Sequence, residues 1–190
     1  MQKVISNITM SLDGFIAGPG ISRQHPMGQN GVRLHNWIFN DKTAIDANIL
    51  NEVMESSGAV IVGSRTYITA IDDAWGGESP FSVPCFVVCH HLPEKPVAGF
   101  TYVTDGIETA FNKAKAVAGD KNIWIMGGAN IIQQYLQAKL LDSLHIHIAP
   151  VLFASGTRLF DQIGIDQIEL NKINVIDTPG ATHILYEFIK

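Results

Sequence analysis

The chain has 190 residues, of which 46% are hydrophobic and 16% are charged, and its formal net charge is −5. This length and composition suit one folded domain over residues 1–190. The acidic balance and the lack of a Lys/Arg cluster exclude a nucleic-acid surface. No apolar run approaches the roughly 20 residues that span a bilayer, and no signal peptide follows Met1, so we expect a cytoplasmic protein without a membrane partner.

Apolar patterns along the chain predict alternating strands and helices. The first strand is expected at residues 3–10. A long loop, residues 11–40, follows it and is rich in Gly, Asn, Pro and His, as functional loops often are. Helices are expected at 43–57, 64–71, 106–118 and 129–138, and further strands at 59–62, 84–89, 101–104, 122–126, 143–149, 168–176 and 181–189.

The order of these elements predicts the fold class. Strands and helices alternate through most of the chain, which favours a parallel sheet covered by helices. The turn signal Thr178-Pro179-Gly180 separates the last two strands, so they should pair as an antiparallel hairpin. We therefore expect an α/β protein with a mostly parallel mixed sheet and an antiparallel C-terminal hairpin.

The strand-to-helix junction at Gly127-Gly128 is the first candidate site. An apolar run ends in these two glycines, and a helical pattern begins directly after them. A turn without side chains lets backbone N–H groups approach a phosphate at the helix N-terminus. The pair is not the dinucleotide fingerprint G-x-G-x-x-G, and a tight turn that needs glycine is the alternative explanation.

A second junction of the same kind lies at Gly63. Here Ser64, Arg65 and Thr66 begin the next helix, and a hydroxyl and a guanidinium suit a phosphate. The alternative is a helix cap with a solvated arginine. Two such junctions in one sheet favour a dinucleotide whose pyrophosphate lies between two helix N-termini.

Two carboxylates are candidates for contact with a substrate. Asp13 follows the first strand, at the edge where open α/β sheets bind ligands, although Asp13-Gly14 is also a simple turn signal. Asp46 borders the apolar face of the first helix, where burial could raise its pKa. The alternative for Asp46 is an acid that interacts with the helix dipole.

Histidine and cysteine patterns predict no metal site. His145 and His147 share a strand face and His90-His91 follow another strand, but neither pair has a third ligand at a defined spacing. These histidines are expected on polar faces or in loops.

A series of short motifs, considered together, resembles a known family over nearly the whole chain. In chain order the motifs are Ser11-Leu12-Asp13-Gly14, Leu34-His35-Asn36-Trp37, Val62-Gly63-Ser64-Arg65-Thr66-Tyr67, Trp75-Gly76-Gly77, Phe86-Val87-Val88, Val103-Thr104-Asp105-Gly106, Met126-Gly127-Gly128-Ala129, Ala149-Pro150-Val151-Leu152 and Ser155-Gly156-Thr157-Arg158-Leu159-Phe160. Their order and spacing resemble dihydrofolate-reductase-like proteins of the type found as the C-terminal domain of the bacterial riboflavin-biosynthesis reductase RibD, here as a stand-alone member.

The resemblance implies a three-layer αβα fold and an oxidoreductase that uses NADPH, with NADH as the alternative. The implied reaction is hydride transfer to a small heterocyclic or sugar-derived substrate, as in 5-amino-6-(5-phosphoribosylamino)uracil reductase or dihydrofolate reductase. It also implies a homodimer, to which the strand of His145 and His147 and the loop 150–160 would contribute. The alternative is a non-catalytic nucleotide-binding or interaction protein of the same fold.

The resemblance also assigns residues to the site. Asp13 and Asp46 would face the substrate, Asp46 near the position of the carboxylate with which dihydrofolate reductases bind the pterin. The implied cofactor contacts are Ser11 and Leu12 at the nicotinamide, Gly63, Ser64, Arg65 and Thr66 on one side of the pyrophosphate, Met126, Gly127, Gly128, Ala129 and Asn130 on the other, and Cys89, His90 and His91 at the adenosine 2′-phosphate.

Overall fold

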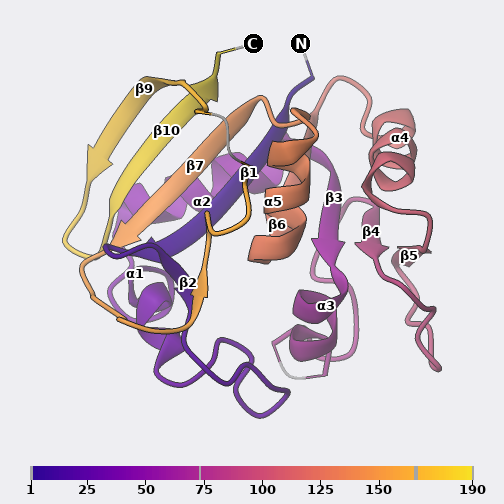
Figure 1. The fold of residues 1–190 in the computed structure, drawn as a ribbon, viewed down its shortest axis with the longest axis horizontal. Helices are drawn as coiled ribbons and strands as arrows, with labels where there is room; N and C mark the ends of the chain where they lie inside the picture. Colours follow the sequence, from indigo (N-terminus) through magenta and orange to yellow (C-terminus); the bar gives the residue numbers. More distant parts are fainter. Residues whose placement is uncertain (1, 73, 165–166, 190) are drawn as a thin grey trace.

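The computed structural model of the chain describes residues 2–72, 74–164 and 167–189. An eight-stranded sheet with the order β5-β4-β3-β6-β1-β7-β10-β9 crosses the molecule (Figure 1). The strands from β5 to β7 are parallel, and β10 is antiparallel to both of its neighbours. The strands are β1 Val4–Ser11, β2 Phe15–Ala17, β3 Ser57–Gly63, β4 Cys85–Val88, β5 Phe100–Val103, β6 Asn122–Gly127, β7 Ser143–Ala149, β8 Thr157–Arg158, β9 Leu170–Asp177 and β10 Thr182–Phe188.

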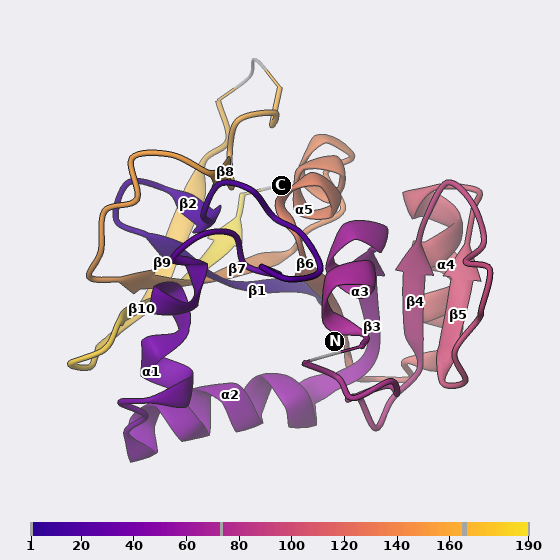
Figure 2. The same cartoon turned by 90° about the horizontal axis from the view of Figure 1, so that it is seen from below.

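Helices cover both faces of the sheet, so the expected three-layer α/β fold is confirmed. Helices α4 and α5 pack on one face, whereas α1, α2 and α3 lie on the other (Figure 2). The helical segments are η1 Gly31–His35 (a 3₁₀ helix), α1 Asn36–Phe39, α2 Ala44–Ser56, α3 Ser64–Ala70, α4 Ile107–Val117 and α5 Ala129–Gln137.

Strand β6 shows how the sequence produces the two cores. Side chains alternate across a strand, and Ile123 and Ile125 are fully buried in the core beneath α4 and α5. Trp124 and Met126 point to the other side, where they pack against the core beneath α3. Both faces of this central strand are therefore covered.

The prediction of a loop throughout residues 11–40 is partly wrong, because the structure places β2, η1 and α1 in this segment. Strand β2 has only three residues, too few for a recognisable alternation. It is held by β8, with Phe15 in register with Arg158, a pairing that the local sequence does not reveal. The short helices η1 and α1 bury Leu34 and Trp37, which anchor the segment on the sheet.

The expected C-terminal hairpin is confirmed. Thr178 donates its backbone N–H to Ala181 O to close the turn, and β9 pairs with β10. This hairpin encloses β7 between β1 and β10. Strand β9 is the sheet edge, and it exposes Ile173 (51%) and Val175 (46%).

Candidate active site

The two glycine junctions lie side by side. Strands β3 and β6 are parallel neighbours, with Val62 in register with Gly127, so α3 and α5 begin at the same sheet edge. Gly63 and Gly128 are the N-cap residues of these helices, and neither N-terminus has a side-chain cap. Backbone N–H groups at the start of both helices are therefore available to an anion.

The two junctions can approach each other closely because side chains are missing there. A Cβ on Gly128 would lie 3.3 Å from Thr66 Oγ1, and a Cβ on Gly63 would lie 3.6 Å from Gly127 O. Gly127 has φ +133°, a conformation that favours glycine, and its peptide bond to Gly128 is cis. The junctions form a cradle with a bare backbone, which fits a pyrophosphate group.

Other predicted cofactor residues surround this cradle. Arg65 is exposed and Ser64 and Thr66 are half-buried in the first turn of α3. On the opposite side Ala129 is buried, and Asn130 Oδ1 accepts a hydrogen bond from Gln134 Nε2 at 2.8 Å.

The residues after β4 are a separate group beside β3. His90 and His91 are exposed, whereas Cys89 is half-buried. Burial raises the pKa of the Cys89 thiol, whose Sγ lies 3.9 Å from Val103 O. Of these three residues, only His90 and His91 have solvent-exposed polar groups that a ligand could contact.

Asp13 lies in a clamp between two loops. Its carboxylate accepts hydrogen bonds from Ser11 Oγ at 2.6 Å and from the backbone N–H groups of Phe153 (3.0 Å) and Ala154 (2.8 Å). Arg158 Nη1 donates to Asp13 O. The Ser11 hydroxyl, and then these backbone donors, lower the pKa of Asp13 to about 2. This placement favours a role in holding the loops over contact with a substrate.

The two residues before Asp13 differ in exposure. Ser11 is buried, and its hydroxyl also accepts a hydrogen bond from Phe15 N, so it is fully engaged inside the turn. Leu12 is 66% exposed, and its backbone N–H donates to Val151 O. Of the two, only Leu12 offers its side chain to a bound molecule.

A pocket of about 400 Å³ lies beside this clamp, where β1 and β7 end. Its volume falls within the range of small-molecule sites. It combines apolar walls with the guanidinium of Arg33, and its lining residues are Pro19, Gln29, Asn30, Arg33, Val151, Leu152, Phe153 and Ser155.

Asp46 is fully buried, and four hydrogen bonds engage its carboxylate. Oδ2 accepts from the backbone N–H of Thr43 (2.8 Å) and from its hydroxyl (2.7 Å). The bond from Thr43 N, together with the bond from Asp46 N to Thr43 Oγ1, forms a capping box at the start of α2. Oδ1 accepts from Thr178 Oγ1 (3.0 Å) and from His183 Nε2 (2.9 Å). Both oxygens are thus occupied by protein donors.

The charge state of Asp46 follows from these bonds. Burial alone would raise the pKa of the carboxyl, but the hydrogen bonds from Thr43, Thr178 and His183 outweigh it, and the pKa is lowered. Burial lowers the pKa of His183 although Asp46 and Asp177 oppose this. We infer an ionised Asp46 beside a neutral His183.

The sequence did not reveal what lies around Asp46. His147 Nδ1 is 2.8 Å from His183 Nδ1, and both rings are buried beneath the indole of Trp37. Trp37 Nε1 donates to Thr9 Oγ1. His147 was expected on a polar face or in a loop, and that expectation is wrong, because Trp37 of α1 covers this face of β7.

Residues 2–72, 74–164 and 167–189 contain neither a metal-binding cluster nor a membrane-spanning helix. In that part of the chain, no group of three or more His, Cys, Asp or Glu side chains is placed to hold a metal ion. No helix within the same residues is long and apolar enough to cross a membrane.

A three-layer fold with two glycine junctions at the carboxyl edge of its sheet defines the class of open α/β proteins, which bind ligands at that edge. Residues 2–180 match the family model of the RibD C-terminal domain, so the chain belongs to that family.

Solved structures share this fold along the whole chain. A Shewanella sp. PV-4 protein, provisionally assigned to riboflavin biosynthesis, is similar with a TM-score of 0.78 and 21% identity over 100% of both chains. A second similar structure is the Thermotoga maritima diaminohydroxyphosphoribosylaminopyrimidine deaminase/5-amino-6-(5-phosphoribosylamino)uracil reductase. Its TM-score is 0.67 and its sequence identity is 12%, and the match covers 99% of this chain and 57% of that one. A third is dihydrofolate reductase from Enterococcus faecalis, complexed with NADP(H). Its TM-score is 0.62 and its sequence identity is 13%, and the match covers 99% of this chain and 97% of that one. The Thermotoga maritima and Enterococcus faecalis proteins are reductases.

Proposed function

We propose that this protein is an NAD(P)H-dependent reductase that transfers hydride to a small heterocyclic or sugar-derived substrate. The observation that carries the proposal is the convergence of Gly63 and Gly127-Gly128 on one cradle with a bare backbone. Family membership supports it, because the solved neighbours include reductases and one contains NADP(H). NADPH is the cofactor we expect, with NADH as the alternative.

The chain's own residues would hold the cofactor in this proposal. The helix N-termini after Gly63 and Gly128 would bind the pyrophosphate, and Arg65 would add a positive charge at its edge. His90 and His91 would lie near the adenosine end, and Leu12 near the nicotinamide. Bound NADPH would supply the hydride, while the protein supplies binding, orientation and exclusion of water.

Cofactor binding is tested first by thermal denaturation. A ligand that binds the native state raises the melting temperature, so we expect NADPH to raise it, and Arg65→Ala to reduce the rise. Lys113→Ala, a change of equal charge on α4, is the matched control and should behave like the wild type. No rise with either NADPH or NADH would reject the proposal.

Turnover is tested by NADPH absorbance at 340 nm with 5-amino-6-(5-phosphoribosylamino)uracil and with dihydrofolate. Oxidation that depends on one of these compounds would support a reductase with that type of substrate. Stabilisation by NADPH without oxidation would favour a non-catalytic nucleotide-binding protein.

We also propose a homodimer, formed through the exposed edge of the sheet and not through β7, which lies enclosed between β1 and β10. Strand β9 presents Leu170, Ile173 and Val175 to solvent, and Leu152 in the loop 150–160 is 68% exposed. Light scattering at micromolar concentration should give twice the mass of the chain, and Ile173→Lys should give the monomer.

A further inference from the structure

Besides His35 Nδ1, three buried side-chain nitrogens have no hydrogen-bond partner among the described residues: Trp124 Nε1, Asn7 Nδ2 and His147 Nε2. They come from β6, β1 and β7, which are neighbours in the sheet. Trp124 is in register with Ile5, and His147 with Thr9, so the three residues step diagonally across the sheet with Asn7 in the middle. Buried polar atoms are rarely left unpaired, and these three nitrogens form a row.

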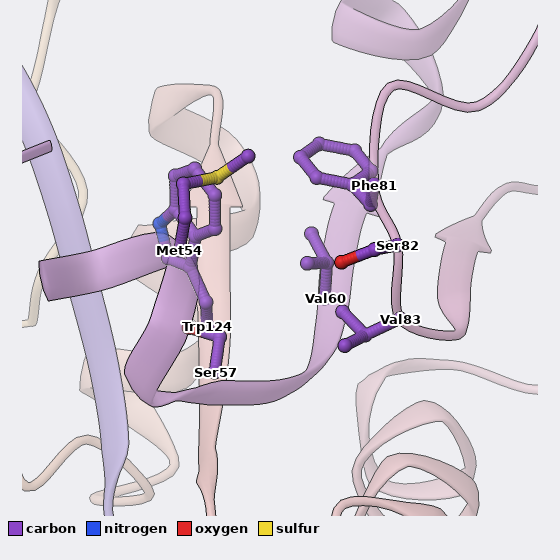
Figure 3. A pocket seen from close by; sticks show the side chains of 7 residues that line it. All are labelled: Met54, Ser57, Val60, Phe81, Ser82, Val83 and Trp124. Carbon is purple, nitrogen blue, oxygen red and sulfur yellow. The ribbon is translucent and has the colours of Figure 1, made fainter. Parts of the chain in front are cut away.

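All three side chains point to the face that α1 and α2 cover. Trp37 of α1 packs on His147, with 4.7 Å between the ring centroids. Trp124 lines a small pocket with the C-terminal end of α2 (Figure 3). Asn7 is in register with His145, and alternate residues of a strand share a face, so Asn7 points the same way as His147.

Asp46 and His183 determine which ring nitrogen of His147 carries the proton. An ionised Asp46 only accepts hydrogen bonds, so His183 carries its proton on Nε2 and its Nδ1 is an acceptor. His147 Nδ1, 2.8 Å away, must then be the donor. A neutral imidazole has one N–H, which leaves a lone pair on His147 Nε2.

We propose that His147 is the hydrogen-bond acceptor of the substrate site, and that Asp46 and His183 are positioning residues that keep its Nε2 unprotonated. Asn7 and Trp124 supply N–H donors in the same row. The substrate that fits carries an N–H or O–H group opposite His147 and acceptor atoms, such as carbonyl oxygens, opposite the two donors. This inference rests on the proposed function, because it assigns substrate recognition to the sheet face beside the cofactor cradle.

Asp46→Asn tests this series of hydrogen bonds, because the substitution should exchange donor and acceptor in each bond from residue 46 through His183 to His147. The backbone N–H of Thr43 still requires an oxygen at the Oδ2 position, so the new amide nitrogen takes the Oδ1 position and donates to His183 Nε2. His183 then carries its proton on Nδ1 and donates to His147 Nδ1. The proton of His147 moves to Nε2, and the acceptor becomes a donor.

Nitrogen NMR of protein labelled at histidine distinguishes the two tautomers directly. We expect an unprotonated His147 Nε2 in the wild type and an Nε2–H in Asp46→Asn. Asp177→Asn, a change of the same chemistry at an exposed position near His183, should leave the wild-type tautomer. An Nε2–H in the wild type, or an unchanged tautomer in Asp46→Asn, would overturn the inference without bearing on cofactor binding.

Steady-state kinetics test recognition of the substrate. With whichever of the two proposed substrates supports NADPH oxidation, Asp46→Asn should lower kcat/KM about tenfold to a hundredfold and leave the NADPH Kd unchanged. If Asp46→Asn does not fold, Trp124→Phe removes a single donor and should raise KM several-fold. Trp75→Phe, in the same apolar cluster, is its control, and equal effects of the two Trp variants would overturn the proposal.

The two proposals can fail separately. Absence of turnover with both compounds would count against the proposed function, and the histidine spectrum would then be titrated with each compound in the presence of NADPH. A His147 signal that neither compound moves at millimolar concentration would overturn the recognition role. A shift without turnover would support that role.

Discussion

The two halves of the candidate site are built in opposite ways. At Gly63 and Gly127-Gly128 the chain removes side chains and leaves the backbone bare. Around Asp46, His183 and His147 it fills the space with polar side chains that bond to one another. Bare backbone suits a group common to many enzymes, such as a pyrophosphate, whereas a side-chain network can be specific to one ligand.

The largest effect should come from removing the centre of the polar network. Asp46→Ala leaves His183, Thr178 and Thr43 without their shared acceptor in a buried place, so the free energy of unfolding should fall by about 3–5 kcal/mol. Urea denaturation measures this loss. Asp177→Ala, on the exposed end of β9, should change stability by no more than about 0.5 kcal/mol. Equal losses in both variants would show that the network contributes little.

The buried histidines should make stability depend on pH. Burial lowers the pKa of His145 to about 4, with a smaller contribution from Lys3. The unfolded chain takes up a proton near pH 6.5, and the folded chain does so only near pH 4, so stability falls as pH decreases through this window. His145→Gln should flatten the slope by up to about 1.4 kcal/mol per pH unit. Denaturation curves at several pH values measure it, and a slope that His145→Gln leaves unchanged would contradict the prediction.

The cofactor cradle should respond to a single methyl group. Gly128 has φ −80°, which alanine adopts freely, so Gly128→Ala should fold. The added Cβ would lie 3.3 Å from Thr66 Oγ1 and narrow the cradle. We expect the NADPH Kd to rise at least about tenfold, which is about 1.4 kcal/mol. Isothermal titration calorimetry measures it, and an unchanged Kd would place the cofactor elsewhere.

The smallest effect on stability should follow from Asp13→Asn. The amide retains one acceptor oxygen for the N–H groups of Phe153 and Ala154, so global stability should change little. The loops that the carboxylate joins should open more often, and limited proteolysis within residues 18–30 should become faster. Cleavage at the wild-type rate would indicate that other contacts hold these loops.

The sequence predicted one half of the candidate site far better than the other. A glycine pair between an apolar run and a helical pattern is visible in a few adjacent residues, so both junctions could be located. His183 meets Asp46 across 137 positions, and His147 meets His183 across 36. No local pattern carries such contacts, because they depend on which strands become neighbours.

The elements of the fold differ in the same way. Long periodic segments such as α5 and β6 were predicted within a residue or two, because their own apolar residues decide their structure. Strand β2 was missed because its partner is β8, far along the chain. The alternation of strands and helices predicted the fold class, and the turn at Thr178 predicted the hairpin that encloses His147.

The clamp at Asp13 has a consequence for insertions. One carboxylate joins two loops that are 140 positions apart, and its bonds to Phe153 and Ala154 tolerate no change in the length of chain on either side. The exposed tip at residues 22–25 closes on itself, with Ser22 and His25 bonded to each other. A peptide tag or a second domain inserted at that tip would therefore leave the clamp intact, whereas the same insertion at 150–154 would separate the two loops.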